Sequence, residues 1–346
     1  MHFLRDLLAR LSLPVRLILG AAVIFVLLII AAFITLRPLY QPVDSLRTPV
    51  RYTVTAGSSL VAVADQLEQQ DIIPSSFMFS LLARWQGVSA AIRAGEYEFL
   101  PGYSPNDILA KMVSGESVQY RLTLVEGWTF RDALDAIWRA EKINVTLRGE
   151  TLATIAQDMA IDRDNPEGLL FPDTYFYTTG TTDLQILRRA HQRLQLVLTD
   201  SWDKRLGALP YNDSYEALIM ASIIEKESSV GSERGHIAGV FIRRLELGMR
   251  LQSDPTVIYG MGSDYDGNIR RADLQTTTPY NTYRVNGLPP TPIALAGEES
   301  IRAAVNPLSS DYLYFVSRGD GSHYFSSTLE EHNAAVNRFQ RQQESQ

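Results

Sequence analysis

Two carboxylates lie two residues apart in a mostly apolar stretch, EALIMASIIEKESSVGSE, at residues 216–233. This stretch predicts a helix, with about 100° of rotation per residue. On the helical wheel Glu227 falls between Met220 and Ile223, in the middle of the strongest apolar stripe, whereas Glu225 points to the other side. Only Glu227 therefore interrupts the face that is expected to turn toward a core.

A carboxylate in that position is costly unless it is paired or lies at the edge of a cleft. Desolvation disfavours the anion and raises the pKa of the carboxyl group, which makes it a usable general acid near neutral pH. Glycoside cleavage needs such an acid, because the leaving oxygen must be protonated. Two structural explanations compete with catalysis for Glu227. It could reach water from a fraying last turn, or it could pair with an arginine such as Arg243, Arg244 or Arg250.

Other catalytic chemistries have little support in the sequence. No GxSxG, HExxH, GxxxxGK[ST] or GxGxxG spacing occurs, which argues against the common serine hydrolases, zinc proteases and nucleotide-binding folds. The five histidines are scattered, and the spacing of the nearest two, His323 and His332, does not suggest a metal site. We therefore expect no metal and no cofactor.

Composition narrows the class of protein. The chain has 346 residues, which predicts roughly two domains, and its formal charge of −7 argues against a nucleic-acid partner. The absence of cysteine excludes disulfides and thiolate metal sites, and it fits an oxidising compartment.

Residues 17–36 form a stretch of 20 residues without a charge, bracketed by Arg16 and Arg37. At about 1.5 Å per residue it spans roughly 30 Å, the thickness of the hydrocarbon core of a bilayer. A cleaved signal peptide would have a shorter apolar region and a small-residue cleavage site, so we predict an uncleaved transmembrane helix. Residues 1–16 would be a short cytoplasmic tail, although the positive charges on the two sides are nearly balanced.

A Pro-containing stretch at residues 37–50 predicts a linker. Three later stretches share one pattern of a strand, a glycine turn, a capping hydroxyl and a helix. They contain the pairs Gly57 and Ser59, Gly102 and Ser104, and Gly127 and Thr129. This similarity is either an internal repeat or the general likeness of strand–helix units. The first copy, YTVTAGSSLVAVADQL, resembles a LysM module, a small βααβ fold that binds glycans.

The predicted organisation is α+β, with a LysM-like module at residues 51–117 and a larger α+β domain at residues 118–346. In the larger domain we expect helices over residues 184–202, within 216–233, over about 232–247 and over 330–343, and a hairpin near its end. The stretches MRLQSDPTVIYGMG and NTYRVNGLPPTPI are expected to form structured loops.

Four segments carry a resemblance to a known family, which covers nearly the whole chain once the apolar helix, the LysM-like segment and GLLFPDTYFY are included. MASIIEKES, SERGHIAGVFIRRLELGMRLQSDPTVIYGMG, NTYRVNGLPPTPI and YLYFVSRGDGSHYFSSTLEEHN closely resemble the endolytic peptidoglycan transglycosylases of the YceG-like family. The resemblance implies an enzyme that cuts the β-1,4 bond between N-acetylmuramic acid and N-acetylglucosamine without water, leaving a 1,6-anhydro end. One carboxyl group would serve first as acid and then as base.

The resemblance also bears on which glutamate acts. In lytic transglycosylases of other folds the catalytic Glu precedes Ser, and here Glu227 precedes Ser228 whereas Glu225 precedes Lys226. We predict Glu227 as the catalytic residue, with Glu225 as a packing residue and the fallback. Candidates for sugar contact carry amides, hydroxyls and aromatic faces, although each could instead stabilise a turn. They are Gln252, Ser253, Asp254, Thr256, Tyr259, Asn281, Thr282, Tyr283 and Asp173.

The family resemblance implies a single-pass protein of the cell inner membrane with its catalytic domain outside, in the periplasm where there is one. Its partners would be peptidoglycan glycan strands and penicillin-binding synthases, and it would end the elongation of glycan strands. Two alternatives remain open: a muramidase that hydrolyses the same bond, and a tethered glycan-binding scaffold without catalysis.

Overall fold

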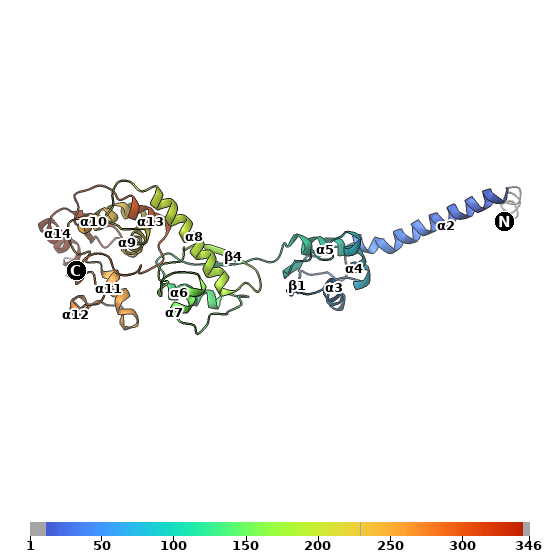
Figure 1. Ribbon diagram of the computed structural model, residues 1–346, viewed down its shortest axis with the longest axis horizontal. Helices are drawn as coiled ribbons and strands as arrows, with labels where there is room; N and C mark the ends of the chain where they lie inside the picture. Colours follow the sequence, from blue (N-terminus) through green and yellow to red (C-terminus); the bar gives the residue numbers. More distant parts are fainter. Residues whose placement is uncertain (1–11, 229, 342–346) are drawn as a thin grey trace. The chain divides into compact units, whose positions relative to one another are not determined.

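The computed structural model describes residues 12–228 and 230–341. The chain divides into two compact units, Met1–Gln119 and Tyr120–Gln346 (Figure 1). The sequence places this division at residues 117 and 118. Of the predicted cytoplasmic tail, residues 1–11 lie outside the described part of the chain.

The first unit begins with the long helix α2, Leu13–Leu36, followed by the short 3₁₀ helix η1, Arg37–Tyr40. The side chains along residues 17–36 are exposed, and the helix is long and apolar enough to cross a membrane, with a mean hydropathy of 3.2. By length and composition such a helix is a candidate for a membrane anchor or a signal sequence.

After η1 the chain forms a small βααβ arrangement and a further helix. The two strands pair antiparallel, with Tyr52 opposite Tyr97, and both tyrosines are buried in the core. The predicted linker is not a free spacer, because Leu39, Val43 and Leu46 pack into this same core. The elements are β1 (Val50–Val54), α3 (Leu60–Gln69), α4 (Ser76–Trp85), β2 (Gly95–Phe99) and α5 (Pro105–Ser114).

The three predicted strand–turn–helix signals are confirmed. Each glycine has a positive φ, +82° at Gly57, +93° at Gly102 and +78° at Gly127. Two residues later the hydroxyl of Ser59, Ser104 or Thr129 accepts a hydrogen bond from a backbone N–H in the first turn of the helix. Glycine takes the left-handed conformation without strain, and the hydroxyl satisfies a helix N–H that would otherwise lack a partner.

The second unit combines helices with two antiparallel strand pairs, β3 with β4 and β5 with β6. Its strands are β3 (Tyr120–Thr123), β4 (Thr174–Tyr177), β5 (Tyr314–Ser317) and β6 (His323–Ser326). Its helices are α6 (Phe130–Arg139), α7 (Leu152–Asp158), α8 (Asp183–Asp203), α9 (Ser214–Glu227), η2 (Gly231–Glu233), α10 (Arg234–Glu246), α11 (Asp254–Met261), η3 (Gly262–Asp264), α12 (Arg271–Gln275), α13 (Glu298–Val305), α14 (Leu329–Val336) and the π-helical turn η4 (Asn337–Arg341).

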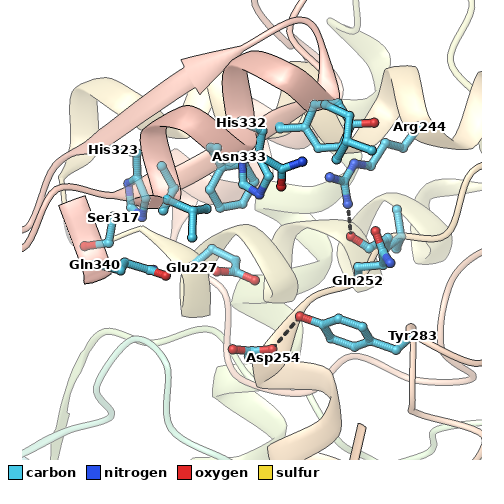
Figure 2. Close-up of a pocket in the computed structure, with 16 residues that line it drawn as sticks. Glu227, Arg244, Gln252, Asp254, Tyr283, Ser317, His323, His332, Asn333 and Gln340 are labelled. Carbon is cyan, nitrogen blue, oxygen red and sulfur yellow. Dashed lines mark hydrogen bonds between the residues drawn. The ribbon is translucent and has the colours of Figure 1, made fainter. Parts of the chain in front are cut away.

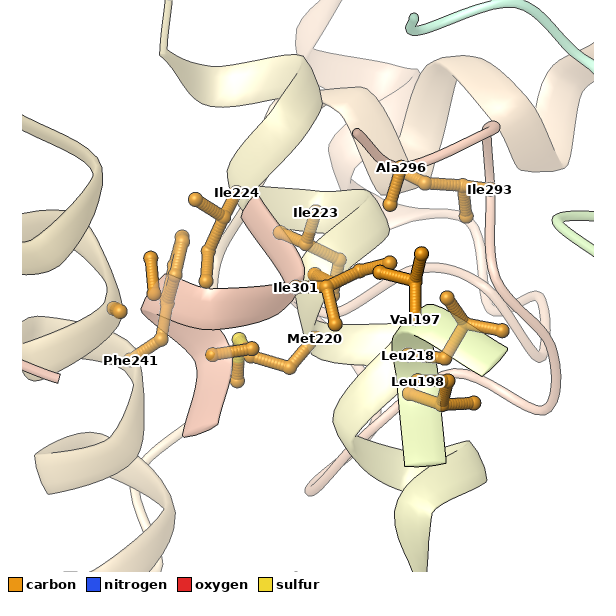
Figure 3. Close-up of a cluster of buried hydrophobic side chains, with 14 of the residues drawn as sticks. Val197, Leu198, Leu218, Met220, Ile223, Ile224, Phe241, Ile293, Ala296 and Ile301 are labelled. Carbon is orange, nitrogen blue, oxygen red and sulfur yellow. The ribbon is translucent and has the colours of Figure 1, made fainter. Parts of the chain in front are cut away.

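Helix α9 is the centre of the largest core (Figure 3). Residues 217–224 are all buried, so the helix is enclosed on every side rather than along one stripe. The buried Ser222 donates to Ile219 O and accepts from Ile293 N at 3.0 Å, which ties α9 to the segment before α13. The side chains around α9 come from α8, α10, α13 and that segment: Val197, Leu198, Phe241, Ile293, Ala296 and Ile301.

The second unit contains α7, α12 and α13, which the sequence did not predict, and it departs from the expected elements at two further places. The stretch predicted as a loop after α10 contains helix α11, because Pro255 lies in its first turn, where a missing N–H costs nothing. The predicted final helix begins at Leu329 and continues as a π-helical turn from Asn337.

Two glycines provide a test of the packing beneath the segment that leads to α13. A Cβ at Gly168 would lie 2.3 Å from Pro292 Cβ, whereas a Cβ at Gly180 would meet nothing within 4 Å, and both residues have a positive φ. Gly168→Ala and Gly180→Ala should share the cost of the left-handed backbone, and Gly168→Ala should lose about 1–3 kcal/mol more from overpacking. Denaturant unfolding of the full chain in detergent measures both. Equal losses would show that Pro292 does not pack on Gly168.

Candidate active site

A cavity of about 580 Å³ opens at the C-terminal end of α9 (Figure 2). Glu227, the last residue of the helix, reaches into it. One wall is the segment before α11 with the start of that helix, and the other is the β5–β6 hairpin with α14 and η4 (Figure 2). The lining residues are Glu227, Arg244, Leu251, Gln252, Asp254, Tyr283, Tyr314, Phe315, Val316, Ser317, His323, Leu329, His332, Asn333, Val336 and Gln340.

The Glu227 side chain is half-buried, and Ser253 Oγ donates a hydrogen bond of 2.6 Å to its Oε1. Desolvation raises the pKa of Glu227 to about 7, and the negative charge of Asp254 adds to the rise. The hydrogen bond from Ser253 and the positive charge of Arg244 oppose it. Near neutral pH the carboxyl group is thus partly protonated, so it can give up a proton and take one back.

Ser253 is held by a cluster of buried hydroxyls. Its backbone N–H donates to Thr282 Oγ1 at 3.0 Å, and its carbonyl accepts from Thr256 Oγ1 at 2.6 Å. Thr256 and Thr282 are fully buried, and their Oγ1 atoms lie 2.8 Å apart. Both threonines were predicted as sugar contacts, but their hydroxyls are used inside the protein to fix the residue that contacts Glu227.

The backbone beside Ser253 has an uncommon conformation. Gln252 has φ +54° and donates its N–H to Thr282 O at 3.2 Å, while its side chain lines the cavity. A left-handed conformation at a residue other than glycine stores a modest strain and is frequent near functional sites. Here it aims Ser253 at Glu227 as the chain turns into α11.

Asp254 and Tyr283 form a pair below Glu227 (Figure 2). The Tyr283 hydroxyl donates to Asp254 Oδ1 at 2.6 Å, and both side chains line the cavity. Burial, strengthened by the neighbouring carboxylates, raises the pKa of Tyr283 above its usual value, so the phenol keeps its proton. Asp254 is therefore a second carboxylate in the cavity, with one oxygen occupied by a phenol.

Arg244 braces the two walls of the cavity. It is buried, and it donates to Leu313 O at 2.7 Å from Nε and to Leu251 O at 2.6 Å from Nη1. Arg243 pairs instead with Asp311 at 3.1 Å, and Arg250 donates to Tyr283 O at 3.0 Å. Among the described contacts, none of these three arginines forms an ion pair with Glu227.

Glu225 has a separate set of partners. Its Oε2 accepts from Gly297 N at 2.9 Å, and its Oε1 lies 3.3 Å from Arg234 Nη2. The side chain is only 6% exposed, and the same arginine also pairs with Glu299. Glu225 thus joins α9 to the starts of α10 and α13 and does not line the cavity.

Ser253, Thr256 and Thr282 are not among the lining residues, and three further predicted sugar contacts also lie away from the cavity lining. Asn281 is buried, and its Nδ2 donates to Thr276 O at 2.6 Å, which holds the turn before Thr282. The Tyr259 hydroxyl donates to Glu167 Oε2 at 3.2 Å. Asp173 is exposed at the start of β4, where it accepts from Thr174 N.

The wall formed by the C-terminal residues was not predicted as part of the site. Tyr314 and Phe315 line the cavity from β5. His323 follows on β6, and its Nδ1 lies 2.7 Å from Glu233 Oε2. Farther along, α14 and η4 contribute His332, Asn333, Val336 and Gln340, spaced by one turn or less. That spacing places the four residues on one helix face, but no sequence pattern near them indicates that this face lies against Glu227.

Within the described residues, no group of three or more His, Asp or Glu side chains could hold a metal ion. The arrangement instead suits proton transfer by one carboxyl group with a raised pKa. A second carboxylate and a phenol lie on one side of it, and aromatic and imidazole rings lie on the other.

The raised pKa of Glu227 has a consequence for stability. Because the folded carboxyl titrates at about 7, against a usual value of 4.5, it destabilises the fold as pH rises through that interval. Glu227→Gln should therefore gain about 2–3 kcal/mol of unfolding free energy relative to wild type on going from about pH 5 to about pH 8. Glu225→Gln is the matched control, and it should lose stability through its broken ion pair with Arg234. Denaturant unfolding at both pH values measures this. A pH-independent difference for Glu227→Gln would contradict the desolvation of Glu227.

The chain is similar to known proteins over most of its length. The model of the YceG-like family matches residues 52–338. An endolytic murein transglycosylase of Bacillus subtilis is 32% identical over 331 residues, which cover 90% of this chain and 91% of the relative. One of Streptococcus pneumoniae is 28% identical over 321 residues, covering 82% of this chain and 57% of the relative.

A solved structure is also similar. The crystal structure of a putative yceG-like protein from Listeria monocytogenes superposes with a TM-score of 0.51 at 32% identity, covering 83% of this chain and 99% of the other. The family match begins inside β1 and includes β2 of the first unit. In the second unit it includes α9, α11 and the hairpin near Glu227. On these similarities the chain belongs to the YceG-like family.

Proposed function

We propose that this protein is a lytic transglycosylase that cleaves the glycan strands of peptidoglycan internally, with Glu227 as its single acid and base. The observation that carries the proposal is the Glu227 carboxyl group at the floor of an open cavity, with a pKa of about 7 and a hydrogen bond from Ser253. The relatives named endolytic murein transglycosylase support the reaction class and the substrate.

In the proposed reaction, protonated Glu227 gives its proton to the oxygen between N-acetylmuramic acid and N-acetylglucosamine as the β-1,4 bond breaks. The resulting carboxylate then removes the proton from the C6 hydroxyl of the muramoyl residue, and that oxygen bonds to C1. The product has a 1,6-anhydro end, no water is consumed, and the carboxyl group ends in its starting protonation state. Attack by a hydroxyl of the same sugar has the entropic advantage of a tethered nucleophile.

The surroundings of Glu227 suit both halves of this cycle. Desolvation and the charge of Asp254 favour the protonated form that starts the reaction. The Ser253 hydroxyl donates to the carboxylate formed in the middle. A hydrolase would instead need a second carboxylate that is free to activate water, and Asp254 is the candidate for that role. Its hydrogen bond from Tyr283 favours the transglycosylase.

Two further parts of the chain complete the proposal. Helix α2 would anchor the protein in the cytoplasmic membrane. The part of the first unit that follows α2 and the whole second unit would lie outside, next to the synthases whose strands the protein would terminate. The βααβ arrangement of the first unit would bind glycan in the manner of a LysM module, which its element order supports.

Product analysis with matched variants tests the reaction. Purified wild-type protein should release products that are one water lighter than reducing ends, and Glu227→Gln should lower the rate by at least about 10²-fold, because general acid catalysis contributes that much. Glu225→Gln, assayed on the fraction that remains folded, should keep far more activity. Reducing ends alone would establish the hydrolase. Wild-type activity in Glu227→Gln would mean that another group is the acid, or that cleavage comes from a contaminant.

The pH dependence of kcat/KM provides an independent test of how the site tunes Glu227. The rate should fall above about pH 7 as Glu227 loses its proton. Asp254→Asn removes a charge that raises the pKa of Glu227, so this fall should move to lower pH. Ser253→Ala removes a hydrogen bond that lowers it, so the fall should move to higher pH. Exposed Asp173→Asn is the control and should not move it. Shifts of Asp254→Asn and Ser253→Ala in one direction would contradict the assignment.

A further inference from the structure

The first unit has an exposed apolar face on α4. Phe77, Leu81 and Trp85 are spaced by four residues and therefore lie on one side of the helix. Their side chains are 72%, 44% and 78% exposed, while Phe79, Leu82 and Ala83 on the opposite side are buried. Three large apolar residues aligned on one helix face are more than the scattered exposure found on most proteins, and such patches mark binding surfaces.

This face continues into the end of the long apolar helix. A groove of about 410 Å³ is lined by Leu36, Leu39, Tyr40, Leu81, Leu82 and Trp85. Leu36 is the last residue of α2, and Tyr40 is the last residue of η1. Because Leu39 between them is only 3% exposed and belongs to the core of the unit, η1 is packed in place and is not a free joint. The end of α2 and the face of α4 therefore form one continuous apolar surface.

We propose that this face of α4, formed by Phe77, Leu81 and Trp85, docks into the lipid bilayer that α2 crosses. The charge-free stretch at residues 17–36 matches the hydrocarbon core, so Leu36 and Tyr40 lie where that core meets the headgroups. Trp and Tyr are the residues that membrane proteins place at this level, and an amphipathic helix lies there with its apolar side a few ångströms deep. Exposed Arg84, beside Trp85, suits the phosphate groups of lipids.

The occupant is lipid and not a second protein because of where the groove lies. The groove is lined by Leu36, in the last turn of the helix that crosses the bilayer in the proposed function, so whatever fills the groove would lie at headgroup depth. This inference rests on the membrane anchor of the proposed function, but not on the reaction. It implies that the first unit is held against the membrane surface rather than tethered freely above it.

Site-directed spin labels can test this cleanly, because the natural chain has no cysteine. We suggest single labels in the full chain, reconstituted in vesicles of phosphatidylglycerol and phosphatidylethanolamine, at Leu81→Cys, at Val61→Cys and at Ile24→Cys. Val61 lies on α3 of the same unit and is 47% exposed, similar to Leu81 at 44%, so it is a matched control. Collision with oxygen, which is lipid-soluble, is compared with collision with a water-soluble nickel chelate.

We expect the label at residue 81 to collide with the nickel chelate at least about three-fold less than the label at residue 61, and more with oxygen. The label at residue 24 should show oxygen contact alone, which verifies the anchor separately. Equal nickel contact at residues 81 and 61, with residue 24 still in lipid, would overturn the docking and leave the anchor intact. Loss of lipid contact at residue 24 would refute the anchor and the docking together. Spin–spin broadening at residue 81 that disappears on dilution with unlabelled protein would assign the face to a second copy and overturn the proposal.

A measurement with the native side chain guards against effects of the label. The chain has four tryptophans. Brominated acyl chains should quench the fluorescence only of a tryptophan that contacts lipid. Trp85→Phe should remove the quenched part of the fluorescence, whereas Trp202→Phe, on α8 of the second unit, should retain it. Unchanged quenching in Trp85→Phe would contradict docking through α4.

Discussion

The hydrogen bond between Ser253 and Glu227 is the contact on which the rest of the second unit depends. It joins the end of the most buried helix to the start of α11 and sets where a carboxyl group meets the cavity. Desolvating that group costs free energy, which the surrounding core has to offset. Helix α9 is enclosed from residue 217 to residue 224, and Ser222 fixes the segment beside it, so the position of Glu227 is determined before any substrate is present.

The two glutamates show how helical geometry assigns different tasks to residues that are close in sequence. Two positions apart means a rotation of about 200°, so their carboxyl groups leave the helix on opposite sides. Glu225 satisfies Gly297 N and the buried end of Arg234, which holds α10 and α13 against α9. With these partners the Glu225 carboxylate has a structural role. The Glu227 carboxyl group instead accepts a hydrogen bond from one neutral donor, Ser253, and faces an open cavity. The ion pair therefore stabilises the frame in which the costlier carboxyl group is held.

Much of the fold could be predicted because its signals are local. A glycine, a capping hydroxyl and an apolar run lie within a few residues of one another, and the three predicted turns formed as expected. Helix α11 was missed because Asp254 before Pro255 reads as a turn, although the same pair suits the first turn of a helix. The residues predicted as a linker join a core because burial of Leu39 and Val43 depends on helices formed later in the chain.

The site was harder to predict than the fold, since a hydroxyl that binds sugar and one that holds the backbone look alike in sequence. Thr256 and Thr282 serve as internal supports, while Gln252 and Asp254 face the cavity from the same segment. The opposite wall depends on an arginine that bridges two carbonyls, and no sequence spacing reports such a contact. Arg244 donates its hydrogen bonds to the carbonyls of Leu313 and Leu251. Its positive charge therefore acts on Glu227 only through space. A direct ion pair would hold the carboxyl group ionised, and a site that must give up a proton requires this separation.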